Sequence, residues 1–119
     1  MTLADASARS GATVRLPRRL AIDLLHRAQI AQPEPIRGFV AARDGRPVAW
    51  RASPPDAPEA CWARLWSVPD APAVPTQDEL HAPGLNLVIS LNTKGVLEIR
   101  AWQRGPHSPV ELILTLEDE

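Results

Sequence analysis

The chain has 119 residues, of which 45% are hydrophobic and 23% charged, and its net charge at pH 7 is −1. This length fits one domain whose core needs no disulfide support. The small net charge shows no excess of positive charge that would indicate binding to nucleic acid or to an anionic membrane. The single cysteine, Cys61, excludes an internal disulfide, and with no apparent signal peptide or apolar run of membrane length we expect a cytoplasmic protein.

The first part of the chain predicts a polar tail and one long helix. Residues 1–12 are small and polar, so we expect a disordered N-terminal tail, followed by a single domain over residues 13–119. A helix should begin at Pro17 and end before Pro33, because a residue that precedes proline avoids the helical conformation. The apolar residues that recur at helical spacing are Leu20, Leu24 and Ala28.

Six apolar segments that follow this helix predict strands, and Asp44-Gly45 marks a hairpin turn between the first two. Thr76 begins a short helix predicted over residues 76–81. The order is therefore helix, three strands, short helix and three strands, which predicts an α+β protein with a mixed sheet flanked by helices. The predicted strands cover residues 39–42, 48–50, 61–68, 85–91, 96–102 and 110–116.

A motif-like pattern begins near the end of the third predicted strand. Trp66 and Val68 lie two positions apart, and Pro69 follows them. Thr76 and Glu79 come next, three positions apart. This spacing resembles the zinc motif of the JAMM family, also called the MPN or Mov34 domain, which reads His-x-His-x7-Ser-x2-Asp. In this resemblance Trp66 and Val68 stand at the two His positions, and Thr76 and Glu79 stand at the Ser and Asp positions.

The resemblance extends from about Leu16 to the C-terminus. The predicted long helix resembles the opening helix of the family, and LNLVISLNTKGVLEIRAWQ resembles its two strands after the zinc motif. The stretch PEPIRGFVAARDG resembles its Pro-Glu-Glu-x-x-Gly strand, with Pro35 at the position of the catalytic glutamate. The resemblance implies a JAMM/MPN-like fold with cytidine-deaminase-like layering.

The substitutions in this pattern remove the chemistry of the family's enzymes. Those enzymes hold zinc with two His and one Asp, and a glutamate moves the proton of the metal-bound water. Indole and isopropyl groups offer no lone pair to zinc, one exposed carboxylate does not hold it specifically, and a proline cannot act as a base. We therefore expect no catalytic residue, no metal site and no cofactor. The degenerate positions are Pro35, Trp66, Val68, Thr76 and Glu79.

The same pattern has a structural explanation. The Thr-x-x-Glu sequence matches a capping box, in which the two side chains satisfy backbone N–H groups at a helix start. Trp66 and Val68 should point to one side of their strand, where apolar side chains would fill the former cleft. Trp62 and Arg64 are expected on the same side. The residues predicted to edge a vestigial binding groove are Trp62, Arg64, Trp66, Val68 and Glu79.

Other reactive side chains are isolated in the sequence. Cys61 has no CxxC partner and is interpreted as a small buried apolar residue. His26, His81 and His107 are not at metal-ligand spacing. A remote metal site formed by His81, Glu79 and a third residue stays open as an alternative. The four tryptophans lie on predicted strands, and a partly exposed tryptophan patch would suit a protein interface.

Two main functional hypotheses follow. The first is a non-catalytic JAMM/MPN-like domain, a pseudo-isopeptidase that acts as a protein-binding or assembly module. The resemblance implies two kinds of partner: ubiquitin-like sulfur-carrier proteins with Gly-Gly tails, on which bacterial relatives act, or another MPN domain. The alternative is an enzyme, a JAMM-type metallopeptidase or isopeptidase with an altered metal site. A third interpretation is an unrelated α+β domain that shares the spacing by chance.

Overall fold

The computed structural model describes residues 13–80, 84–93 and 96–118. In this part of the chain seven strands accompany one α-helix, α2 (Arg18–Ala31). The strands are β1 (Thr13–Pro17), β2 (Arg37–Arg43), β3 (Arg46–Arg51), β4 (Cys61–Val68), β5 (Leu85–Thr93), β6 (Val96–Gln103) and β7 (Val110–Glu117). Two short 3-10 turns complete the fold, η1 (Pro58–Ala60) and η2 (Gln77–Glu79).

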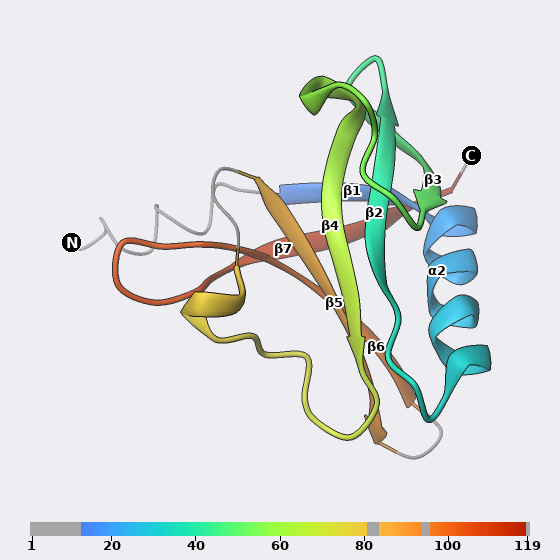
Figure 1. Cartoon of the computed structure of the whole chain (residues 1–119), viewed down its shortest axis with the longest axis vertical. Helices are drawn as coiled ribbons and strands as arrows, with labels where there is room; N and C mark the ends of the chain where they lie inside the picture. Colours follow the sequence, from blue (N-terminus) through green and yellow to red (C-terminus); the bar gives the residue numbers. More distant parts are fainter. Residues whose placement is uncertain (1–12, 81–83, 94–95, 119) are drawn as a thin grey trace.

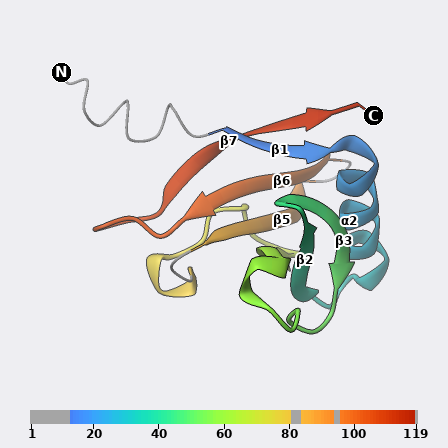
Figure 2. The same ribbon diagram turned by 90° about the horizontal axis from the view of Figure 1, so that it is seen from above.

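The seven strands form one curved sheet in the order β1-β7-β6-β5-β4-β2-β3. Neighbouring strands are antiparallel except for two parallel pairs, β1 with β7 and β4 with β5. Figure 1 shows β1 and β7 crossing behind β4, and Figure 2 shows the sheet wrapping around the interior of the molecule. The result is a nearly closed barrel whose two edge strands are β1 and β3.

Strand β7 contributes to this curvature because it changes partners along its length. Residues 110–112 pair with the end of β6, and residues 113–117 pair with β1 on the other side. Strand β7 therefore connects β6 with β1, two parts of the sheet whose strands run in different directions. A sheet that curves into a barrel requires such a connection.

Helix α2 packs against the open side of the barrel and contacts both edge strands. Its apolar stripe is buried as predicted and packs on interior side chains such as Leu16, Leu65 and Leu87, each with 0% exposure. Burying each such side chain contributes about 1.5–3 kcal/mol, so this main core is the principal source of stability. The helix has 14 residues. No helix among the described residues is both long and apolar enough to cross a membrane.

Most predicted elements are confirmed. The long helix begins directly after Pro17 and ends before Pro33, and the hairpin turn lies at Asp44 and Gly45. All six predicted strands are present, and β4 has the predicted bounds. The tail predicted over residues 1–12 lies outside the described residues.

The predicted fold class, however, is wrong. The protein is mostly β, and its sheet curves into a nearly closed barrel, whereas the sequence predicted an α+β sheet flanked by helices with JAMM/MPN-like, cytidine-deaminase-like layering. Strand β1 was not predicted, because its five residues precede the helix directly and give a weak pattern. The short helix predicted over residues 76–81 is only a 3-10 turn, η2, in the described part. Pro75 and Pro83 bracket that segment and leave little room for an α-helix.

Candidate functional site

The region that resembles the zinc motif lies on the face of the sheet opposite α2. Residues 69–80, here named the covering segment, leave the end of β4 and lie across β5 and β6 (Figure 1). Beneath them is a second, smaller core, separate from the main core under the helix. Its buried members are Ala73, Leu80, Val88 and Trp102, with Trp66 and Val68 packed against them.

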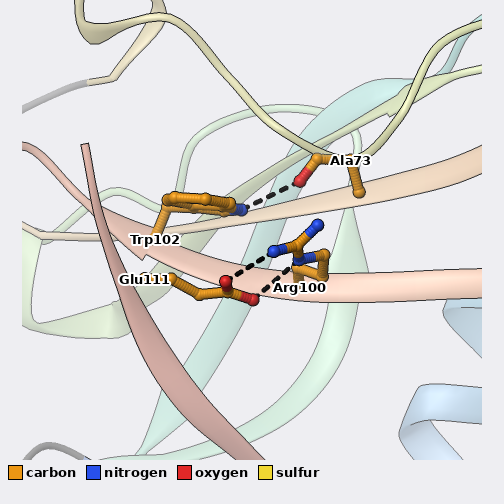
Figure 3. A network of polar contacts seen from close by, with 4 residues as sticks. All are labelled: Ala73, Arg100, Trp102 and Glu111. Atoms are coloured by element: carbon orange, nitrogen blue, oxygen red, sulfur yellow. Dashed lines mark hydrogen bonds and ion pairs between the residues drawn. The ribbon is translucent and has the colours of Figure 1, made fainter. Parts of the chain in front are cut away.

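Hydrogen bonds fix the covering segment to the sheet. The Trp102 indole donates its Nε1–H to the carbonyl of Ala73 at 3.0 Å (Figure 3), and the Ser90 hydroxyl donates to the carbonyl of Ala71 at 2.6 Å. Arg104 Nη1 donates to the carbonyl of Leu80 at 3.3 Å and to that of Gln77 at 3.0 Å. Buried or partly buried carbonyls are thus satisfied at both ends of the segment, which holds it over the second core.

Thr76 and Glu79, which the sequence resemblance aligns with the Ser and Asp positions, form the predicted capping box of η2. The Glu79 carboxylate accepts a hydrogen bond from the backbone N–H of Thr76 at 2.8 Å. Both residues are exposed. The carboxylate that corresponds to a zinc ligand therefore has a structural partner, and the capping box accounts for its presence.

Trp66 and Val68 are the residues that the sequence resemblance aligns with the two His positions. Both are partly buried, and both pack against the second core. Pro35, at the position of the catalytic glutamate, is exposed and directly precedes Ile36. Ile36 is bound to β4: its N–H donates to Ser67 Oγ at 2.8 Å, and its carbonyl accepts from the Ser67 N–H at 3.0 Å. The structure therefore brings the stretch that contains Pro35 next to the strand that carries the motif.

Ser67 itself was not identified from the sequence. It lies between the two motif positions, so its side chain points to the opposite face of β4, where it is 2% exposed. A serine in an alternating strand gives no signal of its own that a neighbouring segment will bind to it.

Gly38 is the residue that the sequence resemblance aligns with the glycine of a Pro-Glu-Glu-x-x-Gly pattern. A Cβ atom at this position would overlap the ring of Trp50 and the carbonyl oxygen of Arg51 on the neighbouring strand β3. The close approach of β3 thus requires glycine here. Packing explains this residue without any catalytic role.

The predicted groove is divided between two sides of the sheet. Where β4 pairs with β2, the register shifts so that Val40 faces Ala63 and Ala41 faces Cys61, which leaves Trp62 without an opposite residue. Trp62 packs against the main core, whereas Trp66 packs against the second core. Arg64 remains on the outer side, with its guanidinium carbon 5.9 Å from the ring centre of Phe39. The bulge separates side chains that simple alternation placed together.

A hollow with a volume of about 750 Å³ lies between the edge strands β1 and β3. Trp62, Val14 and Leu112 contribute apolar surface to it, and Arg15 and Glu117 form an ion pair of 3.2 Å at its border. Its lining residues include no histidine or cysteine.

No group of three His, Cys, Asp or Glu residues among the described residues is arranged to hold a metal ion. His26 and His107 are exposed and lie on separate elements. His81, which entered the alternative metal site with Glu79, lies outside the described residues. Cys61 is partly buried, and its thiol donates to the carbonyl of Ala63 at 3.6 Å.

One ionic pair lies beside the second core. Arg100 donates to both carboxylate oxygens of Glu111, at 2.7 and 2.6 Å (Figure 3). The hydrogen bond that Arg100 donates to Glu111 raises the pKa of Arg100, and burial opposes this effect in part. The guanidinium carbon also lies 5.2 Å from the ring centre of Trp102. Arg100 therefore links β7 to the edge of the second core, and we assign its charge a structural role.

Comparison with known proteins gives a fold and no family. No family model matches the chain, and no curated protein matches it. Among solved structures, the solution structure of protein DSY2949 from Desulfitobacterium hafniense is similar, with a TM-score of 0.67. The two chains are 15% identical, and the match covers 88% of this chain and 93% of that one. At this level of identity the likeness concerns the fold alone.

Proposed function

We propose that this protein is a non-catalytic protein-binding module that retains the spacing of a JAMM zinc motif without its ligands. One observation carries the proposal: Trp66 and Val68 place carbon side chains where the family has imidazoles, and these side chains pack into the second core. A catalytic zinc site needs about three protein ligands and an open coordination position. Filling the site with apolar side chains stabilises the fold and removes the space for water and metal.

The other two catalytic positions support the same proposal. The Glu79 carboxylate accepts the Thr76 N–H, so the one remaining oxygen ligand is engaged in the capping box. Pro35 has no side-chain group that can accept or release a proton. A protein with this arrangement can still present a folded surface to a partner, because binding needs no metal.

The partner we propose is a protein of one of two kinds. The first is a ubiquitin-like sulfur-carrier protein with a Gly-Gly tail, and the second is an MPN-like domain. Both follow from the resemblance in the motif region.

An NMR titration tests this proposal. Isotope-labelled protein is titrated with a Gly-Gly-tailed ubiquitin-like protein and, separately, with an MPN domain. Localised amide shifts with either partner, without added zinc, are the expected result. A parallel assay follows cleavage of a Gly-Gly-linked fusion in the presence of zinc. Cleavage that a chelator abolishes would show that the protein is an enzyme and would refute the proposal.

Restoring the ligands tests the resemblance itself. The variant combines Trp66→His, Val68→His and Glu79→Asp, and calorimetry measures its zinc affinity after circular dichroism has verified folding. Zinc–nitrogen and zinc–oxygen distances of about 2.0–2.2 Å tolerate little error in backbone placement. We expect weak but measurable zinc binding, and no peptidase activity until Pro35→Glu is added, because the proton shuttle is missing. A folded triple variant that binds no zinc would count against the resemblance to the JAMM zinc motif.

A further inference from the structure

The strands β2, β3 and β4 carry an unusual set of charges. Together they contain five arginines and no acidic residue. The arginines are Arg37, Arg43, Arg46, Arg51 and Arg64. The chain as a whole has a net charge of −1, so positive charge is concentrated in one part of the sheet.

The strand register brings three of these arginines together with two aromatic residues. Phe39 on β2 faces Arg51 on β3 and Arg64 on β4, so these three side chains form one row across the sheet. Arg37 faces Trp66 in the adjacent row. Because paired residues project to the same face of a sheet, all five share the side opposite α2. This surface is named the arginine–aromatic face: Arg37, Phe39, Arg51, Arg64 and Trp66.

The arginines of this face lack partners within the described part of the chain. Arg37, Arg51 and Arg64 form no ion pair or side-chain hydrogen bond with another described residue. Four arginines elsewhere do form ion pairs, with Glu117, Asp118, Asp23 and Glu111. Arg19 on α2 also forms no ion pair with a described residue, so what distinguishes this face is that three such arginines lie together on neighbouring strands that carry no acidic residue.

Arg64 provides the most specific observation. Its Nε atom is buried and has no hydrogen-bond partner among the described residues. A buried donor without a partner is costly, because it has lost water and gained nothing in exchange. Its guanidinium carbon lies 5.9 Å from the ring centre of Phe39, over that ring, and a guanidinium presents its N–H donors in a planar fork that suits a carboxylate.

From these contacts we infer that the arginine–aromatic face binds an acidic protein segment. Carboxylates of the partner pair with Arg37, Arg51 and Arg64, and an apolar side chain between them contacts Phe39 and the exposed part of Trp66. Neighbouring strands are about 4.8 Å apart, and β2 lies between β3 and β4. Arg51 and Arg64 are therefore about two strand spacings apart, far enough for each to donate to a separate carboxylate. This inference rests on the proposed function, since it specifies where the module binds and what its partner must carry.

The same face is poorly suited to nucleic acid. Single-stranded nucleic acid is held by bases that stack on free aromatic rings. Here the guanidinium of Arg64 lies over the ring of Phe39, and Trp66 packs against the second core. The net charge of −1 also lacks the excess of positive charge that nucleic-acid binding uses.

Calorimetry with short synthetic peptides tests the inference. The probe is a peptide rich in glutamate and leucine, and its control has glutamine in place of glutamate. We expect the acidic peptide to bind, with an affinity that falls as salt is added, and the glutamine peptide to bind much more weakly. Amide shifts should map to residues 37–39, 49–51 and 64–66. Tighter binding of a single-stranded oligothymidine than of the acidic peptide would overturn the inference.

Variants locate the binding on the protein. Arg64→Gln should lower the affinity for the acidic peptide by about tenfold or more, since hydrogen bonds to charged groups are the stronger ones. Arg51→Gln should lower it by about two- to fivefold, as for a more exposed pair. The matched control is Arg19→Gln, which removes an exposed arginine of α2 that forms no ion pair with a described residue. It should change the affinity by less than about twofold. Equal effects of all three variants would indicate attraction by overall charge and refute a specific face.

The outcomes separate this inference from the proposed function. A Gly-Gly-tailed protein or an MPN domain could bind with amide shifts away from the arginine–aromatic face and with an affinity that Arg64→Gln does not change. That result would support the proposed binding function and refute the inference that this face is the binding site. If the acidic peptide binds the arginine–aromatic face and a chelator-sensitive peptidase activity is also found, the inference about the binding face is supported and the proposed non-catalytic function is refuted.

Discussion

Replacing Trp102 with alanine should destabilise the protein more than the same change at Trp66, although both indoles belong to the second core. Trp102 is 7% exposed and donates a hydrogen bond to Ala73, whereas Trp66 is only partly buried. A buried tryptophan removes about 150–250 Å² from water, which at about 25 cal/mol per Å² corresponds to about 4–6 kcal/mol as an upper bound. Residual compactness of the unfolded chain lowers this value by about 10–40%.

The lost indole hydrogen bond adds about 1 kcal/mol. We therefore expect Trp102→Ala to lower the free energy of unfolding by about 4 kcal/mol, within the range for large-to-small core changes. Trp66→Ala should cost about 2 kcal/mol, because a smaller part of its indole leaves water on folding. Trp102→Phe keeps most of the ring and removes the N–H donor, so it should cost about 1–2 kcal/mol.

Urea denaturation followed by far-ultraviolet circular dichroism measures these values without relying on the tryptophan fluorescence that the variants alter. The matched control is Val74→Ala, a truncation in the same covering segment at a side chain that is 53% exposed. It should change stability by less than about 0.5 kcal/mol. If Trp66→Ala costs as much as Trp102→Ala, or if Val74→Ala is equally harmful, then the second core is not anchored on Trp102 and the reasoning fails.

Three further changes test individual contacts. Ser67→Ala should lower the free energy of unfolding by about 1–3 kcal/mol in urea, because the Ile36 N–H loses its acceptor in a partly buried position; no change would mean that water replaces the hydroxyl. Thr76→Ala should cost about 1 kcal/mol in thermal unfolding through loss of the cap of η2, and an unchanged midpoint would show that the capping box adds nothing. Glu111→Gln should cost at most about 1 kcal/mol, since the pair with Arg100 is about one-third exposed. The pKa of Arg100 is raised, so the stability that its ion pair with Glu111 contributes is present at neutral pH and is lost only in strong alkali. A loss of this stability near neutral pH would contradict the assignment.

The sequence by itself determined the local elements. The apolar spacing that begins at Leu20 identified α2, alternation identified β4 to the residue, and the Thr-x-x-Glu pattern identified the capping box. Each of these depends on interactions within a few residues, so the periodicity of helices and strands and the chemistry of caps are visible in the chain. The lack of ligand atoms in Trp66 and Val68 was visible in the sequence, whereas their packing against the second core was seen only in the structure.

Only the tertiary structure decided how these elements combine. The sheet curves into a nearly closed barrel because β7 changes partners and pairs in parallel with β1, a contact between residues about 100 positions apart. The bulge that turns Trp62 towards the main core depends on the register between β2 and β4, and a shift of one residue exchanges the two faces of a strand. The row of Arg51, Phe39 and Arg64 has the same origin: these residues come from three strands, and no pattern in the sequence connects them. Long-range pairing selects which side chains meet, so the arginine–aromatic face could be recognised only after the sheet was known.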